Sequence, residues 1–565
     1  MSPLIRQRKS YPLKRNLPDA PNAEPTQTAG LPLEIQEEQQ SSALWKAHRQ
    51  REHRKERFER IYALTRSLES SGQSDDASNW CDTLFELADN NLELGRAYTL
   101  KATVKELQGS WRESLDAVQA GLQLFDIALP RDAEAINAGL KQYMNRTMEI
   151  LKTRSIQSLV EMPQVSDARF EVIMKLLFRV IPSAVQLNPP LFMLADLMLF
   201  DLSVKHGTTS VAAKNFVDCG IIVGSMLQQW ETGYELGMAA YQLLDKYPNS
   251  GLRCGVEFVF ATYISHWKDH FSKSLTCFDN SIIAGLEVGD LSHTSYAFIH
   301  LLIRKLYVGR PLAECSADVE RTVVFLENAN TRNQTALTDI ICRTIAELCS
   351  TPTGTNAPAT LDDTEFVAHL LASNNAVDIG TYSQLMAWVG YLKQDNDSAL
   401  EWSLHALPYV YALEGMFPLP DVYLLLVLSG AQHLSQQHIA VKSSPPLEKP
   451  LSHAMSRLQQ WSKLCPANFA HKFHLAKAAM LQFEQQPDEE IRHHYAAALA
   501  SIDASSFVNW RASIHAHRSQ FLMRIGEKRA ATNDLKEAIA LYTQWGATAV
   551  AALLEKKLPM AHTDP

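Results

Sequence analysis

One C-terminal stretch of this 565-residue chain brings together residues whose types could bind a metal. Cys465, His471 and His474 offer a thiol and two imidazoles, and the two histidines, three residues apart, share one face of a helix. A zinc site would need a fourth ligand or an open coordination position. The start and the packing of a helix explain these residues better, so we expect no metal and no cofactor.

Two other histidine-containing pairs could suggest catalysis. His493 and His494 stand among charged residues and a tyrosine, which is typical of a solvated helical turn. His266 and Trp267, in SHWKDH, have no serine or cysteine nucleophile arranged with a base nearby in the sequence. We interpret this second pair as an anchor at a junction between helices, while a site assembled in space from dispersed residues stays open.

The eight cysteines form no CxxC pair, which indicates reduced thiols packed as small apolar groups in a cytosolic protein. Cys342 and Cys349 lie seven residues apart on one helical stripe, the spacing of core residues. The chain contains no GxxxxGK[ST] phosphate loop, no HRD or DFG kinase motif and no Rossmann GxGxxG. The sequence therefore predicts that the chain is not an enzyme.

The most charged stretch, HRQREHRKERFERI at 48–61, interleaves basic residues with glutamates. This mixed pattern and the formal net charge of -9 argue against nucleic acid as the partner, although a nucleic-acid arm stays an alternative. We interpret the stretch as a solvated helix that docks the side carrying Trp45, Phe58, Ile61 and Tyr62 on the first repeat or on a partner. The candidate interaction residues are Arg49, Arg54, Arg57, Phe58 and Arg60.

The elements that position these residues follow from periodicity and composition. The first 42 residues have few large apolar side chains and many Pro, Gln, Glu, Ser and Thr, so they cannot offset the entropy of ordering. Beyond them the apolar pattern is helical almost to the end. The expected organisation is a disordered tail at 1–42, a charged amphipathic helix and linker at 43–75, a first block of helical repeats at 76–348, a loop at 349–365 and a second block at 366–560.

The helical part shows a loose repeat. Small residues allow two antiparallel helices to approach closely, a glycine supplies the turn between them, and a tryptophan packs across it. Each pair would expose its apolar face alone, so neighbouring pairs must stack. The sequence predicts an all-α fold, an α-solenoid of degenerate tetratricopeptide-like helix pairs. The repeat positions are Tyr98, Ala102, Gly109, Trp111, Trp230, Gly233, Tyr234, Gly237, Trp388, Ala399, Trp402, Gly526, Trp545 and Gly546.

Seven stretches carry a more specific resemblance. They are SLDAVQAGLQLFDIALPRD (114–132), LNPPLFMLADLMLFDLSVKHG (187–207), WETGYELGMAA (230–240), YISHWKDHFSKSL (263–275), AGLEVGDLSHTSYAFIHLLIRKLYVGRPL (284–312), WSKLCPANFAHKFHLAKAA (461–479) and LYTQWGATAVAALLEKKLP (541–559). In this order the chain resembles the helical central region of large bacterial and fungal hybrid proteins. In those, a serine/threonine kinase and an AAA ATPase precede the region, and GAF and histidine-kinase domains follow it.

The resemblance implies a helical-repeat fold and an interaction role, and it does not extend to the catalytic domains. We expect a cytoplasmic, non-enzymatic scaffold or regulatory subunit in signalling that binds a protein or peptide on a concave surface. By analogy, a separately encoded kinase or ATPase is a candidate partner. The alternative is a helical-repeat regulator that senses a ligand or peptide inside the superhelix and acts on a separate kinase, ATPase or transcription component. The apolar run at 189–200 contains Asp196 and is too short to span a bilayer, so we expect no membrane association through it.

Overall fold

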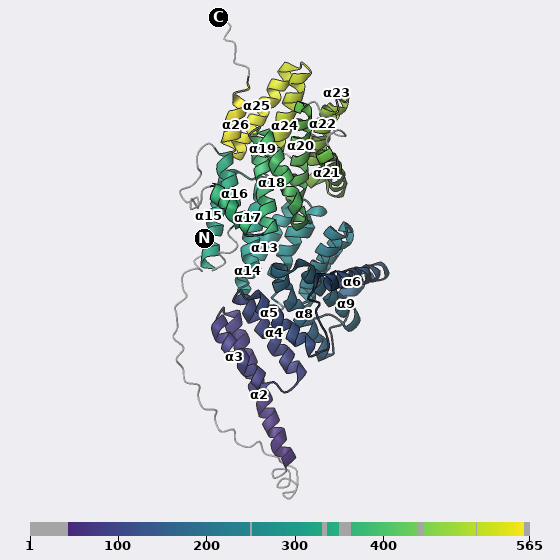
Figure 1. Ribbon diagram of the computed structural model, residues 1–565, viewed down its shortest axis with the longest axis vertical. Coiled ribbons are helices and arrows are strands. Elements are labelled where there is room, and N and C mark those ends of the chain that lie inside the picture. Colours follow the sequence, from purple (N-terminus) through teal and green to yellow (C-terminus); the bar gives the residue numbers. More distant parts are fainter. Residues whose placement is uncertain are drawn as a thin grey trace.

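The fold was taken from a computed structural model that describes residues 43–248, 251–329, 336–349, 363–437, 445–503 and 506–558. These residues form helices joined by short turns, and their β structure is one isolated bridge between Gln164 and Thr208. The helix pairs stack into an elongated α-solenoid (Figure 1). The chain therefore has the all-α fold that its periodicity predicts. Within the described residues, every helix is too short or too polar to cross a membrane.

The first part of the solenoid, which we call the N-terminal stack, runs from α2 to α9. Its helices begin near the lower end in Figure 1 and rise toward the middle. They are α2 (Ala43–Ser70), α3 (Ser74–Leu87), α4 (Asn91–Leu107), α5 (Trp111–Gln123), α6 (Ala133–Thr153), α7 (Ile156–Val160), α8 (Ala168–Leu187) and α9 (Pro189–His206).

A junction follows, in which two α-helices continue into π-helical segments. It comprises α10 (Ala212–Ile221), the π-helix η1 (Ile222–Met226), α11 (Trp230–Lys246), α12 (Arg253–Val259), the π-helix η2 (Phe260–Ile264), the 3₁₀ turn η3 (Ser265–Trp267) and α13 (Phe271–Val288).

The remainder, which we call the C-terminal body, runs from α14 to α26. Its elements are α14 (Leu291–Tyr307), α15 (Leu312–Asn328), α16 (Ala336–Leu348), α17 (Asp363–Ala372), α18 (Ala376–Leu392), α19 (Asn396–Ala406), the 3₁₀ segment η5 (Leu407–Leu413), α20 (Leu419–Gln437), α21 (Pro445–Leu464), α22 (Pro466–Phe483), α23 (Asp488–Ala500), α24 (Val508–Arg524), α25 (Lys528–Trp545) and α26 (Thr548–Glu555).

In the N-terminal stack each core is built from helices that are near in sequence. Phe58 and Ile61 of α2 are buried against residues of α3 and α4, in a small cluster that includes Leu84 and Leu100. The next cluster joins α4 and α5 to α8 and α9, with Leu122 and other fully buried side chains. This is the neighbour-on-neighbour arrangement expected of a solenoid.

The junction depends on close approach of two backbones. A Cβ added to Gly233 of α11 would lie 2.6 Å from the Cα of Gly224 and 2.7 Å from the carbonyl oxygen of Gly220. Such contacts are far inside van der Waals range, so only glycine fits at position 233. Gly237, one turn further on, faces the ring of Phe260.

The C-terminal body shares one continuous core with the junction, and contacts between segments about 200 residues apart close this core. The Asn468 side chain donates to the carbonyl oxygens of His266 and Asp269 at 2.7 and 2.9 Å and accepts from the Phe271 amide. Asn509 donates to two carbonyl oxygens at the end of α14. Turns of the superhelix that are distant in sequence therefore bind each other directly.

Several boundaries differ from the expected ones. The linker expected up to residue 75 is only the turn 71–73, because α3 begins at Ser74 and Asp75 and Asp76 occupy its first turn, where acidic side chains favour a helix N-terminus. The core also runs without a break from the first expected block into the second. The expected tail at 1–42 and most of the expected loop at 349–365 lie outside the described residues.

Candidate interaction surface

The interior of the C-terminal body contains a buried ion pair. The Lys472 ammonium of α22 lies 2.6 Å from both carboxylate oxygens of Asp421 on α20, and both side chains are almost fully excluded from water. Burial raises the pKa of Asp421 and lowers the pKa of Lys472, and the charge of the partner opposes each shift. The ring of Phe417 lies between this pair and the buried Arg304, whose guanidinium is 4.1 Å from the ring centroid.

His266 and Trp267 lie beside this interior and join the junction to the body. The Trp267 indole N–H donates to the carbonyl oxygens of Tyr263 and Gly415, both at 3.0 Å. His266 is fully buried, its Nδ1 lies 3.4 Å from a guanidinium nitrogen of Arg304, and burial lowers its pKa well below the ordinary value. The pair occupies the position of a helix-junction anchor.

The cysteine and histidines singled out as possible metal ligands separate in space. Cys465 caps the start of α22 and points its thiol at the Asp269 carbonyl, 3.6 Å away. His471 is buried against Phe507. His474 instead meets His494 of α23, with the two Nδ1 atoms 2.9 Å apart. The described residues contain no group of three or more ligand-type side chains able to hold a metal ion.

The two cysteines expected on a core stripe are half-buried. Cys342 lies on α16 and Cys349 directly after it, and both pack against the large core of the body. The Cys349 thiol donates to the Gly546 carbonyl oxygen at 3.5 Å, which ties α16 to the end of α25.

The predicted repeat positions fall into three groups. Gly109, Gly526 and Gly546 have positive φ angles and end or join helices, whereas Trp388, Trp230 and Trp545 are buried in the core of the body, with Trp388 stacked on Trp510. The remaining positions lie on helices. Ala102 and Ala399 are fully buried, Gly233 and Gly237 lie at the junction, and Tyr98, Trp111, Tyr234 and Trp402 are half-buried.

The candidate interaction residues of α2 divide between its two sides. Phe58 is fully buried, and Arg54 turns inward to form ion pairs with Glu93 and Asp89. These two residues fix α2 to the first repeat, so they are not available to a partner. Arg49, Arg57 and Arg60 lie on the exposed side.

A patch of exposed apolar side chains marks the turn between α13 and α14. We call Ile283, Leu286, Val288 and Leu291 the turn patch, and their exposed fractions are 58, 55, 52 and 42%. Gly289, in the left-handed conformation, makes the turn that brings them to one end of the helix pair. Sequence reasoning missed the patch, because Ile and Leu at helical spacing look like core residues.

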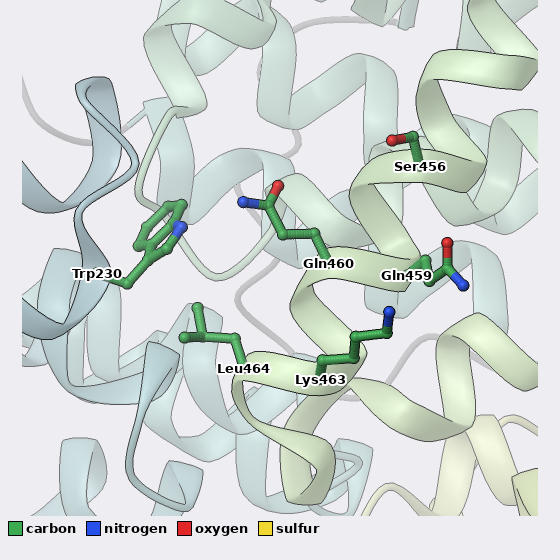
Figure 2. A pocket seen from close by; sticks show the side chains of 6 residues that line it. All are labelled: Trp230, Ser456, Gln459, Gln460, Lys463 and Leu464. Carbon is green, nitrogen blue, oxygen red and sulfur yellow. The ribbon is translucent and has the colours of Figure 1, made fainter.

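A second surface feature lies between the junction and the body. Trp230, at the start of α11, faces the C-terminal half of α21 across a hollow of about 490 Å³ (Figure 2). We call it the junction hollow. Its other lining residues, all on α21, are Ser456, Gln459, Gln460, Lys463 and Leu464.

The chain was compared with protein-family models and with the sequences of known proteins. No protein-family model matches the chain. Hybrid signal transduction histidine kinase G of Dictyostelium discoideum is 26% identical over 116 residues, which is 20% of this chain and 3% of that protein. The chain thus matches only a small fraction of the length of that relative, and the expected kinase–ATPase family is not established by it.

Solved structures of helical-repeat proteins cover most of the chain at low similarity. Yeast Tom70 aligns over 89% of this chain and 99% of its own, with 12% identity and a TM-score of 0.28. Naa15, in a structure with Naa10 and HypK, aligns over 93% of this chain and 74% of its own, with 11% identity and a TM-score of 0.19. With TM-scores below 0.5, these likenesses assign neither a fold nor a function to this chain.

Proposed function

We propose that this chain is a non-enzymatic helical-repeat scaffold or regulatory subunit that binds a partner protein. The observation that carries the proposal is the turn patch, in which four large apolar side chains close together in sequence are about half exposed. Contiguous exposed apolar surface is unfavourable in water and typically marks a protein-binding site. The proposed site is therefore the turn between α13 and α14.

The charges beside the turn patch favour one kind of occupant. Asp279 and Glu287 are exposed on α13, four residues before Ile283 and one residue after Leu286. An amphipathic helix with an apolar stripe and basic flanking residues would bury the patch and complement these carboxylates. We therefore propose that the partner presents such a helix.

The chemistry of the buried groups supports a non-enzymatic role. Burial raises the pKa of the Cys315 thiol to about 12 and that of Cys277 to about 12, which leaves little thiolate at neutral pH. The buried Asp421 and Lys472 neutralise each other inside the core. These ionisable groups act as structural groups within the solenoid.

We further propose that the scaffold acts in signalling. The short match to a hybrid histidine kinase and the seven stretches that resemble such proteins support a role in signalling. A separately encoded kinase or ATPase remains the candidate partner by analogy, in the cytoplasm.

The test purifies the wild-type chain and its variants from the native cells and compares the sets of proteins that co-purify with each. The variant Ile283→Asp/Leu286→Asp should lose a specific partner, because a carboxylate in an apolar interface is left unpaired. Leu64→Asp, at an exposed leucine on α2 far from the turn patch in the chain, is the control and should keep that partner. Glu287→Lys should weaken binding of the same partner, because the new ammonium group repels the basic residues that flank the partner's apolar stripe.

The proposal fails if the Ile283→Asp/Leu286→Asp variant keeps every partner of the wild type, with circular dichroism showing an unchanged fold. It also fails if Leu64→Asp causes the same losses. A purified chain that turns over ATP in a Lys472-dependent manner would contradict the non-enzymatic role.

A further inference from the structure

The junction hollow combines features of a built binding site. Its two walls are 226 residues or more apart in sequence, with Trp230 on one side and α21 on the other (Figure 2). Trp230 and Leu464 supply apolar surface, whereas Ser456, Gln459 and Lys463 supply a hydroxyl, an amide and an ammonium group. The hollow thus presents hydrogen-bond donors beside an apolar floor, as small ligand sites do.

The charge of the hollow comes from one residue. Lys463 is exposed and has no ion-pair partner within the described residues. Glu231, which follows Trp230 in the chain, is paired with Lys268. The Lys463 ammonium is therefore available to an anion, since Glu231, the acidic residue next to Trp230 in the chain, is already neutralised by Lys268.

Trp230 contributes a second feature of the hollow. Its side chain is 92% buried, and its indole Nε1 has no hydrogen-bond partner within the described residues. The same is true of Trp388, Trp461, Trp510 and Trp545, but of these five only Trp230 lines the hollow. In Figure 2 this nitrogen faces Gln460, whose amide makes a bond of 3.3 Å to the exposed Gln228. An unpaired buried donor costs free energy, and a small movement of Gln460 would let an acceptor in the hollow reach it.

The backbone around the hollow is irregular in a way typical of functional sites. The π-helix η1 ends at Met226, four residues before Trp230, and η2 ends at Ile264, three residues before Trp267. The two indole rings lie 4.6 Å apart. Single-turn π segments inside α-helices change the register of the following side chains and are frequent at functional sites.

We propose that the junction hollow binds a carboxylate group carried by a peptide, with an apolar side chain beside it. The carboxylate meets the Lys463 ammonium and the neighbouring Ser456 and Gln459 donors. The apolar group lies over Trp230 and Leu464, and a backbone carbonyl accepts from the Trp230 indole once Gln460 moves. This site deepens the proposed function, on which it rests, by adding a second contact that differs from the turn patch.

Three hexapeptides distinguish the sources of the carboxylate. All carry an acetylated N-terminus and the sequence Gly-Ser-Gly-Ser-Gly-Leu, the first with a free C-terminal carboxylate and the second with a C-terminal amide. The third replaces the last Ser by Glu and ends in an amide. Binding to the full chain is measured by saturation-transfer NMR, supported by titration calorimetry.

The free acid or the Glu peptide should bind, and the plain amide should bind at least fivefold more weakly, because it lacks the charge that Lys463 pairs with. Lys463→Met should remove that preference. Lys449→Met, at an exposed lysine of the same helix outside the hollow, is the matched control and should leave it unchanged. Trp230→Phe keeps an aromatic ring without the N–H and should weaken all peptides that bind.

Equal binding of all three peptides, or no binding of any, overturns the proposal. Equal effects of Lys463→Met and Lys449→Met overturn it as well, because attraction would then be unspecific. The Ile283→Asp/Leu286→Asp variant should bind the peptides normally. If the peptides fail to bind while the partner still binds at the turn patch, this site fails and the proposed function stands. If the peptides bind through Lys463 while substitution of the turn patch changes no partner, the proposed function fails and this site stands.

Discussion

The N-terminal stack and the C-terminal body are built from the same kind of helix pair but are held together differently. In the stack, ion pairs between helices join segments that lie fewer than 100 residues apart in the chain, as between Arg179 of α8 and Glu106 of α4 at 3.1 Å. In the body, Asn468 and Asn509 bind carbonyl groups about 200 residues earlier in the chain. A solenoid whose turns contact only their neighbours unfolds in pieces, whereas one whose distant turns bind each other is expected to unfold as a unit.

The largest expected difference between the two regions concerns ion pairs. Lys472→Ala leaves Asp421 buried without a counter-charge and should lower the free energy of unfolding of the body by about 3–5 kcal/mol. Glu59→Ala, which removes the exposed pair with Arg96 in the stack, should cost only about 0.2–1 kcal/mol. Urea denaturation followed by circular dichroism measures both.

A charge-free replacement serves as the control for this prediction. Asp421→Leu/Lys472→Met removes both charges together and should recover most of the loss, because no unpaired charge remains in the core. A double variant as unstable as Lys472→Ala would show that the pair is needed for its hydrogen bonds rather than for charge balance.

Tryptophan truncation should give the next largest contrast. Trp388→Ala empties the centre of the aromatic core between Trp510 and Trp545 and should cost about 3–5 kcal/mol. Trp111→Ala, at a half-buried ring in the stack, should cost about 1 kcal/mol. Thermal melting of the two variants checks the ranking, and equal losses would contradict the contrast in packing.

The bonds that close the body should have an intermediate effect. Asn468→Ala removes three hydrogen bonds between α22 and residues 266–271 and should cost about 1–3 kcal/mol, since buried carbonyl groups lose their donor. Ser462→Ala, on the exposed side of α21, is the control, because its hydroxyl bonds only within its own helix. If both variants had the melting temperature of the wild type, the Asn468 hydrogen bonds would not stabilise the closed body.

Acid should weaken the body through the buried histidine of α14. Burial lowers the pKa of His300 from 6.5 to about 3. Between these two pH values the His300 imidazole is therefore protonated in the unfolded chain and neutral in the folded body. The stabilisation from neutral His300 is complete above pH 6.5 and declines as the pH falls from 6.5 toward 3. His300→Gln should reduce the slope of stability against pH in that window, measured by urea denaturation at several pH values. An unchanged slope would place the titration elsewhere.

Local features of the fold could be predicted from the sequence, while the closure of the body could not. Gly109 and Gly526 indicate turns because their spacing separates two apolar stripes, and both turns occur between paired helices. The partners of Asn468 depend on the pitch of the superhelix, which sums small rotations over many helix pairs. Periodicity does not specify those rotations.

The contacts and exposed surfaces of the candidate site residues also could not be predicted from the sequence. His474 and His494 are notable in the sequence, but their contact links neighbouring helices and replaces the grouping with Cys465 that spacing alone indicates. The turn patch could not be found either, because sequence pattern does not distinguish an apolar side chain that faces a neighbour from one that faces water. Ile283 is exposed although its helical position resembles that of a core residue.

Native-state hydrogen exchange in rising denaturant tests the contrast between stack and body most directly. We expect amides of η2–α13, α22 and α24 to lose protection together, at one free energy, and those of α2 and α3 to open earlier and independently. If α22 and α24 instead exchange at a free energy well separated from that of residues 260–288, the distant segments do not close one unit and the body is an ordinary open solenoid.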